Sequence, residues 1–224
     1  MKIGDLVNDV ADLLGNRSDI NTRISKWIAY GYRDIGHAIP FEELEETDYT
    51  LLVPNLGGYD YPIGARAIKS MTMGFPAGKP TSRRPLRKRN IKILDRYNLS
   101  TPGTPSIWAP FKNQFHVRPV PDQGYPLIIR FWKKVQLDQM DINNTELLVP
   151  DDWVEIVQYQ AQIRGFMGLL EFDKAAAVRT MLYGNPKQPD KPGLLKQRLT
   201  RIQAEYMDAD YGFRPKLSRY TYST

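Results

Sequence analysis

The sequence contains no cysteine and only two histidines in 224 residues. Without cysteine, the chain has no disulfide, no thiol nucleophile and no sulfur ligand for a metal ion. The histidines, His37 and His116, belong to different predicted elements, and neither lies in an E-x-x-H or H-x-x-x-H pattern typical of helical metal sites. We therefore expect structural roles for both imidazoles, and no metal or other cofactor.

Long apolar runs are also missing. No stretch approaches the ~18 apolar residues needed to cross a bilayer. The first residues, MKIGDLVNDVADLLGN, carry acidic side chains inside their apolar stretch, which a signal peptide does not. We therefore expect no interaction with a membrane.

Acidic residues are scarce in the middle of the chain. Residues 61–140 hold 15 Lys and Arg but 3 Asp and Glu, whereas residues 1–60 hold 5 against 11, and residues 141–224 hold 11 of each. The formal net charge of +6 therefore conceals a strongly basic middle segment. Such a segment predicts an acidic partner.

Two amphipathic helices are predicted before residue 40. Apolar residues recur at helical spacing in two stripes, which end at Gly15 and at Pro40. The stripes consist of Ile3, Val7, Val10 and Leu14, and of Ile20, Ile24, Ile28, Gly31 and Ile35. Because the link between them is short, the helices should pack as a hairpin.

The middle of the chain shows the two-residue alternation of β-strands. Two alternating runs, NQFHVRPV and YPLIIRFWKKVQ, flank PDQG, whose proline, aspartate and glycine suit a tight turn. This arrangement predicts a β-hairpin. The two earlier alternating runs contain Tyr49, Leu51 and Val53, and Met71, Met73 and Phe75.

Helical spacing returns after residue 150. The segment PDDWVEIVQYQAQIRGFMGLLEFDKAAAVRTMLYG predicts one long helix capped by Asp151 or Asp152. NPKQPDKPG ends this helix, and a shorter helix follows. The final residues have no helical stripe.

Together these elements predict an α+β fold, in which a helical bundle carries an inserted small antiparallel β lobe. The bundle would consist of the N-terminal helix pair and the long C-terminal helix, because their apolar faces must cover one another. We expect N-terminal helices at 1–45, the β lobe at 46–140, C-terminal helices at 141–208 and an extended tail at 209–224.

Candidate catalytic groups have simpler explanations. Asp151 and Asp152 complement the dipole of a helix start, and EELEE at 42–46 is typical of a solvated loop. GFPAGKPTS resembles a phosphate loop, but it is one residue short, and Pro80 stands where Ser or Thr must bind magnesium. We therefore expect no catalytic residue, and a turn at GFPAGKPTS.

The segment RRPLRKRNIK concentrates positive charge without any acidic residue. It is either a solvated loop between strands or an element that faces phosphates. No helix-turn-helix, zinc-finger or RNA-recognition pattern is present, so contact with nucleic acid would be with the backbone, non-specific and sensitive to salt. The basic residues are Arg83, Arg84, Arg87, Lys88, Arg89 and Lys92.

The C-terminal segment YGFRPKLSRYTYST alternates apolar and polar residues. An extended peptide of this kind can add to a partner's sheet or fill a partner's groove. The alternative is that the segment is a frayed, disordered chain end. Its aromatic content favours docking. The docking residues would be Tyr211, Phe213, Arg214, Pro215, Leu217, Tyr220 and Tyr222.

The order of motifs resembles the head-to-tail adaptor proteins of tailed bacteriophages. A short helix, NIKILDRYN, precedes TPGTPSIWAPFKNQFHVRPVPDQGYPLIIRFWKKVQLDQM, and LLVPDDWVEIVQYQAQIRG follows after a linker. The N-terminal WIAYGYRDI segment also fits, so the resemblance spans about residues 1 to 183.

This resemblance implies a structural virion protein. Such adaptors form a dodecameric ring beneath the portal, extend the DNA channel, and provide the platform for tail or nozzle proteins. Packaged duplex DNA would pass through the lumen without sequence-specific contacts. The protein would be in the host cytoplasm during assembly and in the neck of the finished particle.

Other functions stay open at the level of sequence. The basic lobe could instead meet an acidic surface of the portal or tail. A small nucleic-acid-binding protein without sequence preference is the main alternative. A cell-wall hydrolase, a function linked to some relatives, ranks last because no residue identifies its active site.

Overall fold

The computed structural model describes residues 1–16, 18–39, 41–74, 83–97, 101–137, 141–188 and 191–207. The chain divides into two compact units. One, here called the helical unit, combines Met1–Glu43 with Val135–Thr224, and the other, the β unit, spans Leu44–Lys134. Helices and two four-stranded sheets together make the fold α+β, as the sequence predicts.

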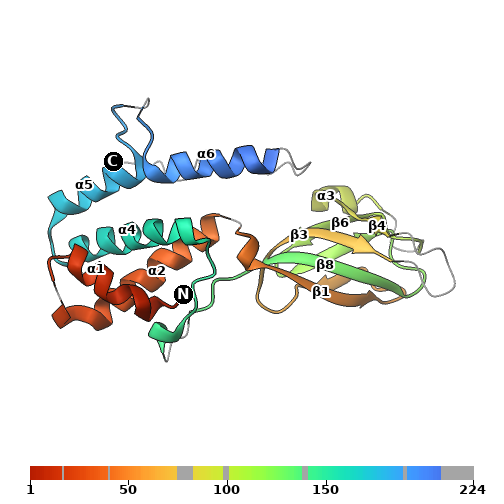
Figure 1. The fold of residues 1–224 in the computed structure, drawn as a ribbon. Helices are drawn as coiled ribbons and strands as arrows, with labels where there is room; N and C mark the ends of the chain where they lie inside the picture. Colours follow the sequence, from red (N-terminus) through yellow and green to blue (C-terminus); the bar gives the residue numbers. More distant parts are fainter. Residues whose placement is uncertain are drawn as a thin grey trace. The chain divides into compact units, whose positions relative to one another are not determined.

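The helical unit is built around α4, which spans Asp151–Gly168. It packs against α2 (Asn21–Ala38) and α5 (Phe172–Tyr183), and α5 in turn contacts α6 (Leu194–Met207) (Figure 1). The remaining helices are α1 (Val7–Leu13) and the short 3-10 turns η1 (Ile3–Leu6), η2 (Ser18–Ile20), η3 (Glu42–Leu44) and η4 (Ile142–Asn144).

Helix α2 is amphipathic, and its apolar stripe faces α4. Ile24 and Ile28 are fully buried, which fits the spacing seen in the sequence. The two helices approach closely at Gly31, because a side-chain Cβ there would be 3.0 Å from the Cβ of Gln160. Tyr32 is also buried, and its hydroxyl accepts a hydrogen bond of 3.0 Å from the backbone N–H of Leu148.

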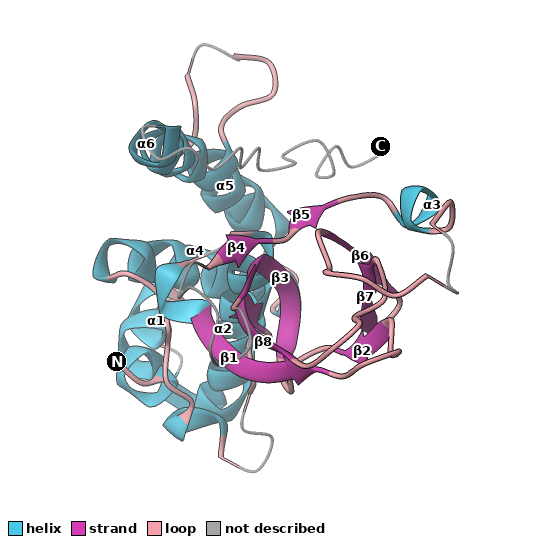
Figure 2. Cartoon of the chain, turned by 90° about the vertical axis from the view of Figure 1, so that its right-hand side faces the viewer, coloured by secondary structure: helices cyan, strands magenta, loops and turns pink. Residues whose placement is uncertain are grey.

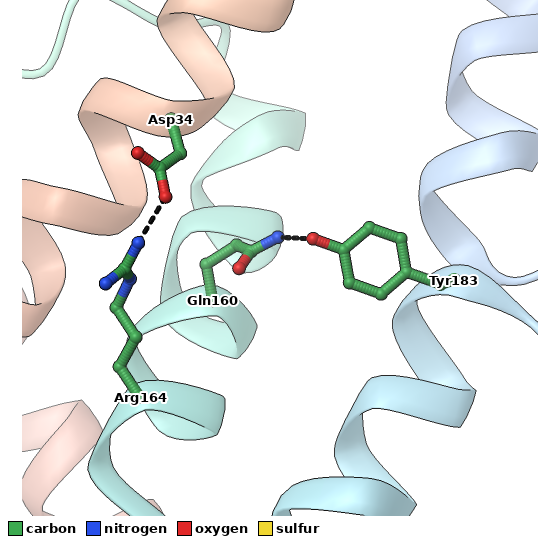
Figure 3. Close-up of polar contacts among 4 residues, drawn as sticks. All are labelled: Asp34, Gln160, Arg164 and Tyr183. Carbon is green, nitrogen blue, oxygen red and sulfur yellow. Dashed lines mark hydrogen bonds and ion pairs between the residues drawn. The ribbon is translucent and has the colours of Figure 1, made fainter. Parts of the chain in front are cut away.

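Polar side chains link the three central helices (Figure 3). Arg164 on α4 forms an ion pair with Asp34 on α2, and the amide of Gln160 on α4 donates to the hydroxyl of Tyr183 on α5. These contacts bind α4 to a different neighbour on each side.

The predicted single long helix after residue 150 is wrong in one respect. The structure divides it into α4 and α5, with Leu170 between them at a φ of 62°. Apolar residues continue the helical spacing through the break, which is why the sequence shows one helix. Met167 and Leu170 are nevertheless 54% and 74% exposed, so this part of the stripe lies largely at the surface.

The β unit contains two sheets, which Figure 2 shows on opposite sides of its interior. The first sheet has the order β1-β8-β3-β4 and the second β2-β7-β6-β5. The strands are β1 (Glu45–Leu52), β2 (Gly58–Asp60), β3 (Ala65–Met73), β4 (Arg84–Pro85), β5 (Arg87–Lys88), β6 (Ile107–Phe111), β7 (Gln114–Arg118) and β8 (Tyr125–Lys133). A short helix, α3 (Ile91–Leu94), follows β5.

Side chains from both sheets meet in one apolar core. Met71 and Ile129 reach it from the first sheet, and Trp108 and Phe115 from the second. Each of these four is less than 2% exposed. The alternation of buried and exposed residues along β8 follows directly from the two-sided geometry of a strand.

The predicted hairpin between NQFHVRPV and YPLIIRFWKKVQ does not form. The first run becomes β7 and pairs with β6 and β2, whereas the second becomes β8 and pairs with β1 and β3 in the other sheet. The link crosses between the sheets, and the carbonyls of Val120 and Pro121 accept hydrogen bonds from Gly103 and Asn55. The alternation identified the strands, but it carried no information about their partners.

The lobe is also not purely antiparallel. β5 pairs in parallel with β6, Arg87 beside Ile107 and Lys88 beside Trp108. Because β5 is reached directly from β4, the chain enters the second sheet along its edge rather than through a hairpin.

Among the described helices, none is long and apolar enough to cross a membrane.

Candidate functional site

The basic segment 83–92 is an ordered connection between the two sheets. β4 pairs with β3 in the first sheet, and β5 pairs with β6 in the second (Figure 2). Leu86, between these strands, is 5% exposed and belongs to the core. Its backbone N–H donates to the carbonyl of Met71 over 2.9 Å. This buried leucine therefore anchors the segment while its charged neighbours stay at the surface.

The backbone of β5 fixes the direction of the arginines. The N–H of Arg87 donates to the carbonyl of Ser106 over 3.0 Å, and the N–H of Arg89 donates to that of Trp108 over 2.8 Å. Alternate residues of an extended strand point to the same side. Arg87 and Arg89 therefore share a side, and Lys88 points to the other, where its ammonium lies 5.3 Å from the centre of the Trp108 ring.

Three of the six predicted basic residues line one groove. Arg84, Arg87 and Arg89 are exposed and border an open depression of about 660 Å³, and none of its lining residues is acidic. These arginines make no ion pair with any other described residue. The other lining residues are Pro85, Ile93, Tyr97, Ser106 and Ile107.

Helix α3 positions the opposite wall of the groove. The side chain of Asn90 caps it by accepting the N–H of Lys92 over 3.0 Å. Its buried Leu94 packs with Ile107 of β6. This packing leaves Ile93 and Tyr97, which are 40% and 39% exposed, along the groove.

The remaining predicted basic residues, Arg83, Lys88 and Lys92, are exposed but do not line this groove. They are further exposed cations of the same segment, and Lys88 points away from the side that Arg87 and Arg89 share. The sequence therefore identified a basic surface, and the structure separates it into three groove residues and three neighbours.

Arg118 is a buried cation that sequence reasoning missed. It is 9% exposed, and its guanidinium donates to the carbonyls of Val117 at 2.8 Å and Gly57 at 3.4 Å. A side chain at Gly57 would collide with it. Burial lowers the pKa of Arg118, and the charge of Asp95 opposes that shift. Because its hydrogen bonds go to backbone carbonyls, we assign Arg118 a structural role.

His116 has a similar setting on the same strand. Burial lowers the pKa of its imidazole, and the charge of Arg118 lowers it further, while Asp95 acts in the opposite direction. The ring packs edge-on against Phe111 at 5.9 Å. His37 lies in the helical unit, on α2. Within the described residues, no group of three or more His, Cys, Asp or Glu side chains could hold a metal ion.

Three of the carboxylates considered for catalysis, Asp152, Glu45 and Glu46, take part in ion pairs. Asp152, in the first turn of α4, accepts from Arg198 at 2.7 Å. In the acidic run 42–46, Glu45 pairs with Lys69, and Glu46 lies 3.7 Å from Lys133. These carboxylates serve the fold at the surface.

Exposed apolar side chains form a second kind of surface. The alternating residues Tyr49, Leu51 and Val53 mark strand β1 and the residue after it, as predicted, but they are 75%, 55% and 46% exposed. The core residue of this strand is Leu52. In the helical unit, Leu170 and Phe172 are 74% and 60% exposed. The two sets are typical of surfaces that other proteins cover.

The predicted docking residues of the tail, Tyr211, Phe213, Arg214, Pro215, Leu217, Tyr220 and Tyr222, lie outside the described residues. The same holds for residues 75–82, which contain most of GFPAGKPTS.

Comparison with known proteins identifies the family. No curated protein matches the chain. A family model, described as SU10 adaptor protein, matches residues 1–186 and so includes both sheets and helices α1 to α5. This match agrees with the resemblance to head-to-tail adaptors, and it supports a structural role and a place in the virion. The chain belongs to the SU10 adaptor protein family of phage adaptors.

Proposed function

We propose that this protein forms the head-to-tail adaptor ring beneath the portal of a tailed phage. In this role it extends the DNA channel and provides the platform on which tail or nozzle proteins dock. The observation that carries the proposal is the family match over residues 1–186. We propose a ring of twelve copies, as the family resemblance implies, which assembles in the host cytoplasm and stays in the neck of the virion.

The surfaces of the chain support a protein that works in an assembly. Exposed apolar residues are present in each unit, on β1 and at the turn between α4 and α5. A ring repeats every surface once per subunit, so a moderate apolar or basic patch becomes a continuous band. A structural role of this kind requires no active site.

The C-terminal segment completes the proposal. Residues 209–224 would form an extended tail that docks on the portal or on a neighbouring subunit, through the aromatic residues Tyr211, Phe213, Tyr220 and Tyr222. Peptides with alternating apolar residues bind well at sheet edges and in grooves. Removing residues 209–224 should weaken association with the portal and leave the folding of both units unchanged.

Assembly with the portal tests the proposed function directly. The purified chain should be monomeric or weakly associated alone, and it should form rings when the portal of the same phage is added, as measured by light scattering and electron microscopy. Replacing Leu170 and Phe172 with Ser should weaken this assembly without changing the circular dichroism of the chain. Persistent monomer beside an assembly-competent portal would contradict the proposal.

A further inference from the structure

The groove between β5 and α3 has the properties of a phosphate-binding site. We infer that Arg84, Arg87 and Arg89 bind the phosphodiester backbone of double-stranded DNA without reading its sequence. The inference deepens the proposed function, because DNA passes this surface only if the protein works as an adaptor. The binding itself can be measured on the isolated chain.

Unbalanced charge is the first argument. No acidic residue lines the groove, and the three arginines make no ion pair with another described residue. Two arginines of the helical unit, by contrast, have acidic partners: Arg164 pairs with Asp34, and Arg198 with Asp152. Three like charges around one depression repel each other, and an anion that entered would remove this repulsion.

The rigidity of the groove is the second argument. Hydrogen bonds to Ser106 and Trp108 hold the backbone at Arg87 and Arg89. Leu86, the residue before Arg87, is buried in the core and anchors the start of this stretch. Side chains two residues apart on one side of a strand are about 6.6 Å from each other. A row of cations with this spacing suits a polymer with regularly repeated phosphates better than a single small anion.

The lining residues also indicate which part of DNA is contacted. Reading bases in the major groove requires a helix or a two-stranded ribbon that can enter it. Helix α3 has 4 residues, too few to enter a groove, and β5 has 2 and is paired with β6. The groove contains no Asn or Gln that could pair with an adenine edge. Contact with the backbone alone is what these elements permit.

An acidic protein is the other partner to consider. Arginine is enriched in protein interfaces, but the Asp and Glu side chains that would neutralise it are depleted there. The arginines here are exposed at an open depression, and Arg83 and Lys92 are further exposed cations of the same segment. Exposed, hydrated and strongly positive surfaces are typical of protein–DNA interfaces. The observations therefore favour DNA.

Salt-dependent binding of a labelled duplex to the full chain tests the inference. The wild-type chain should bind duplexes of unrelated sequence equally well in fluorescence anisotropy, and its affinity should fall steeply as salt rises. Replacing Arg84, Arg87 and Arg89 with Gln should reduce the slope of log affinity against log salt by about 2 to 3, since each phosphate contact contributes about 0.9.

Two matched variants separate the groove from total charge. Replacing Lys187, Lys191 and Lys196 with Gln removes the same charge from exposed positions of the helical unit, and this variant should keep the wild-type slope. Replacing the three groove arginines with Lys keeps the charge and should keep most of the slope. Circular dichroism of each variant checks that it is folded.

Several results would overturn the inference. These are no binding of duplex at low salt, equal loss in the groove and control variants, or equal affinity for polyphosphate of the same charge. Loss of portal binding with unchanged DNA binding in the groove variant would instead assign the groove to a protein partner. If rings form with the portal while DNA binding is absent, this inference fails and the proposed function stands.

Discussion

The helical unit and the β unit use their polar and apolar groups in opposite ways. In the helical unit, α2 and α4 approach closely at Gly31, and polar side chains such as Asp34 and Arg164 link the helices. In the β unit, one apolar core joins the sheets, and three arginines without an ion pair among the described residues line a groove at the surface.

This difference separates stability from surface chemistry in the β unit. Leu86 anchors the basic segment in the core, so Arg84, Arg87 and Arg89 can face solvent without any role in packing. In the helical unit, charged groups such as Arg164 and Asp34 also connect elements, so changing them affects a contact between helices as well as the surface. A binding surface is therefore easier to assign in the β unit.

The largest expected effect is at the core of the β unit. Trp108→Ala removes a side chain that is 1% exposed and contacts residues of both sheets, and it should lower the free energy of unfolding by about 3–5 kcal/mol. Urea denaturation followed by circular dichroism measures this. Ile63→Ala, at a position 98% exposed in the same unit, should change stability by less than about 0.5 kcal/mol.

A comparable test in the helical unit uses the helix contact at Gly31. Gly31→Leu places side-chain atoms where a Cβ would already be 3.0 Å from Gln160, and the destabilisation should be about 1–3 kcal/mol. Lys26→Leu, at an exposed position on the same helix, is the matched control. Equal stabilities of the two variants would show that α2 and α4 can separate without loss.

The polar links of the helical unit should contribute less than its packing. Asp34→Asn removes the ion pair with Arg164, whose side chain is 36% exposed, and should cost about 0–1 kcal/mol. High salt should reduce the difference from wild type, because exposed ion pairs are screened. A loss as large as that of Gly31→Leu would mean that the polar links dominate the unit.

The smallest expected effect is a change in the stability of the β unit with pH. Burial lowers the pKa of His116 below its ordinary value of 6.5, so the unfolded chain takes up the proton first as the pH falls. His116 should therefore make the protein less stable as the pH drops below about 6.5, until the folded imidazole is protonated as well. His116→Gln should remove this part of the acid sensitivity.

Urea denaturation between neutral and mildly acidic pH measures that change, with His37→Gln as the control for loss of an imidazole from the other unit. Because the chain has two histidines, a proton NMR titration can also follow His116 directly. An unchanged pH dependence in His116→Gln would show that other groups cause the acid sensitivity.

Helical spacing predicted α1 and α2 correctly, because one face of each helix is buried and therefore apolar. In α2, Ile24 and Ile28 are fully buried. The same spacing ran through the break between α4 and α5, where Met167 and Leu170 continue the stripe although both are largely exposed. Periodicity reports which residues are apolar, but it does not report whether anything covers them.

The candidate site shows the same limit. Six basic residues without an acidic neighbour were visible in the sequence, but their division into groove and surround was not. That division depends on Leu86, which turns inward between β4 and β5. It also depends on Ile93 of α3 and on Tyr97 after this helix, which line the groove from further along the chain. Buried Arg118 carried no signal in the sequence, because its partners are backbone carbonyls.

The sequence by itself determined the α+β class, the positions of most helices and strands, and the basic segment, because these depend on neighbours a few residues apart. Only the tertiary structure decided that β7 and β8 belong to different sheets, that β5 runs parallel to β6, and that three arginines face one groove. Those features depend on contacts between residues far apart in the chain, which are set by the packing of the whole core and which no local pattern encodes.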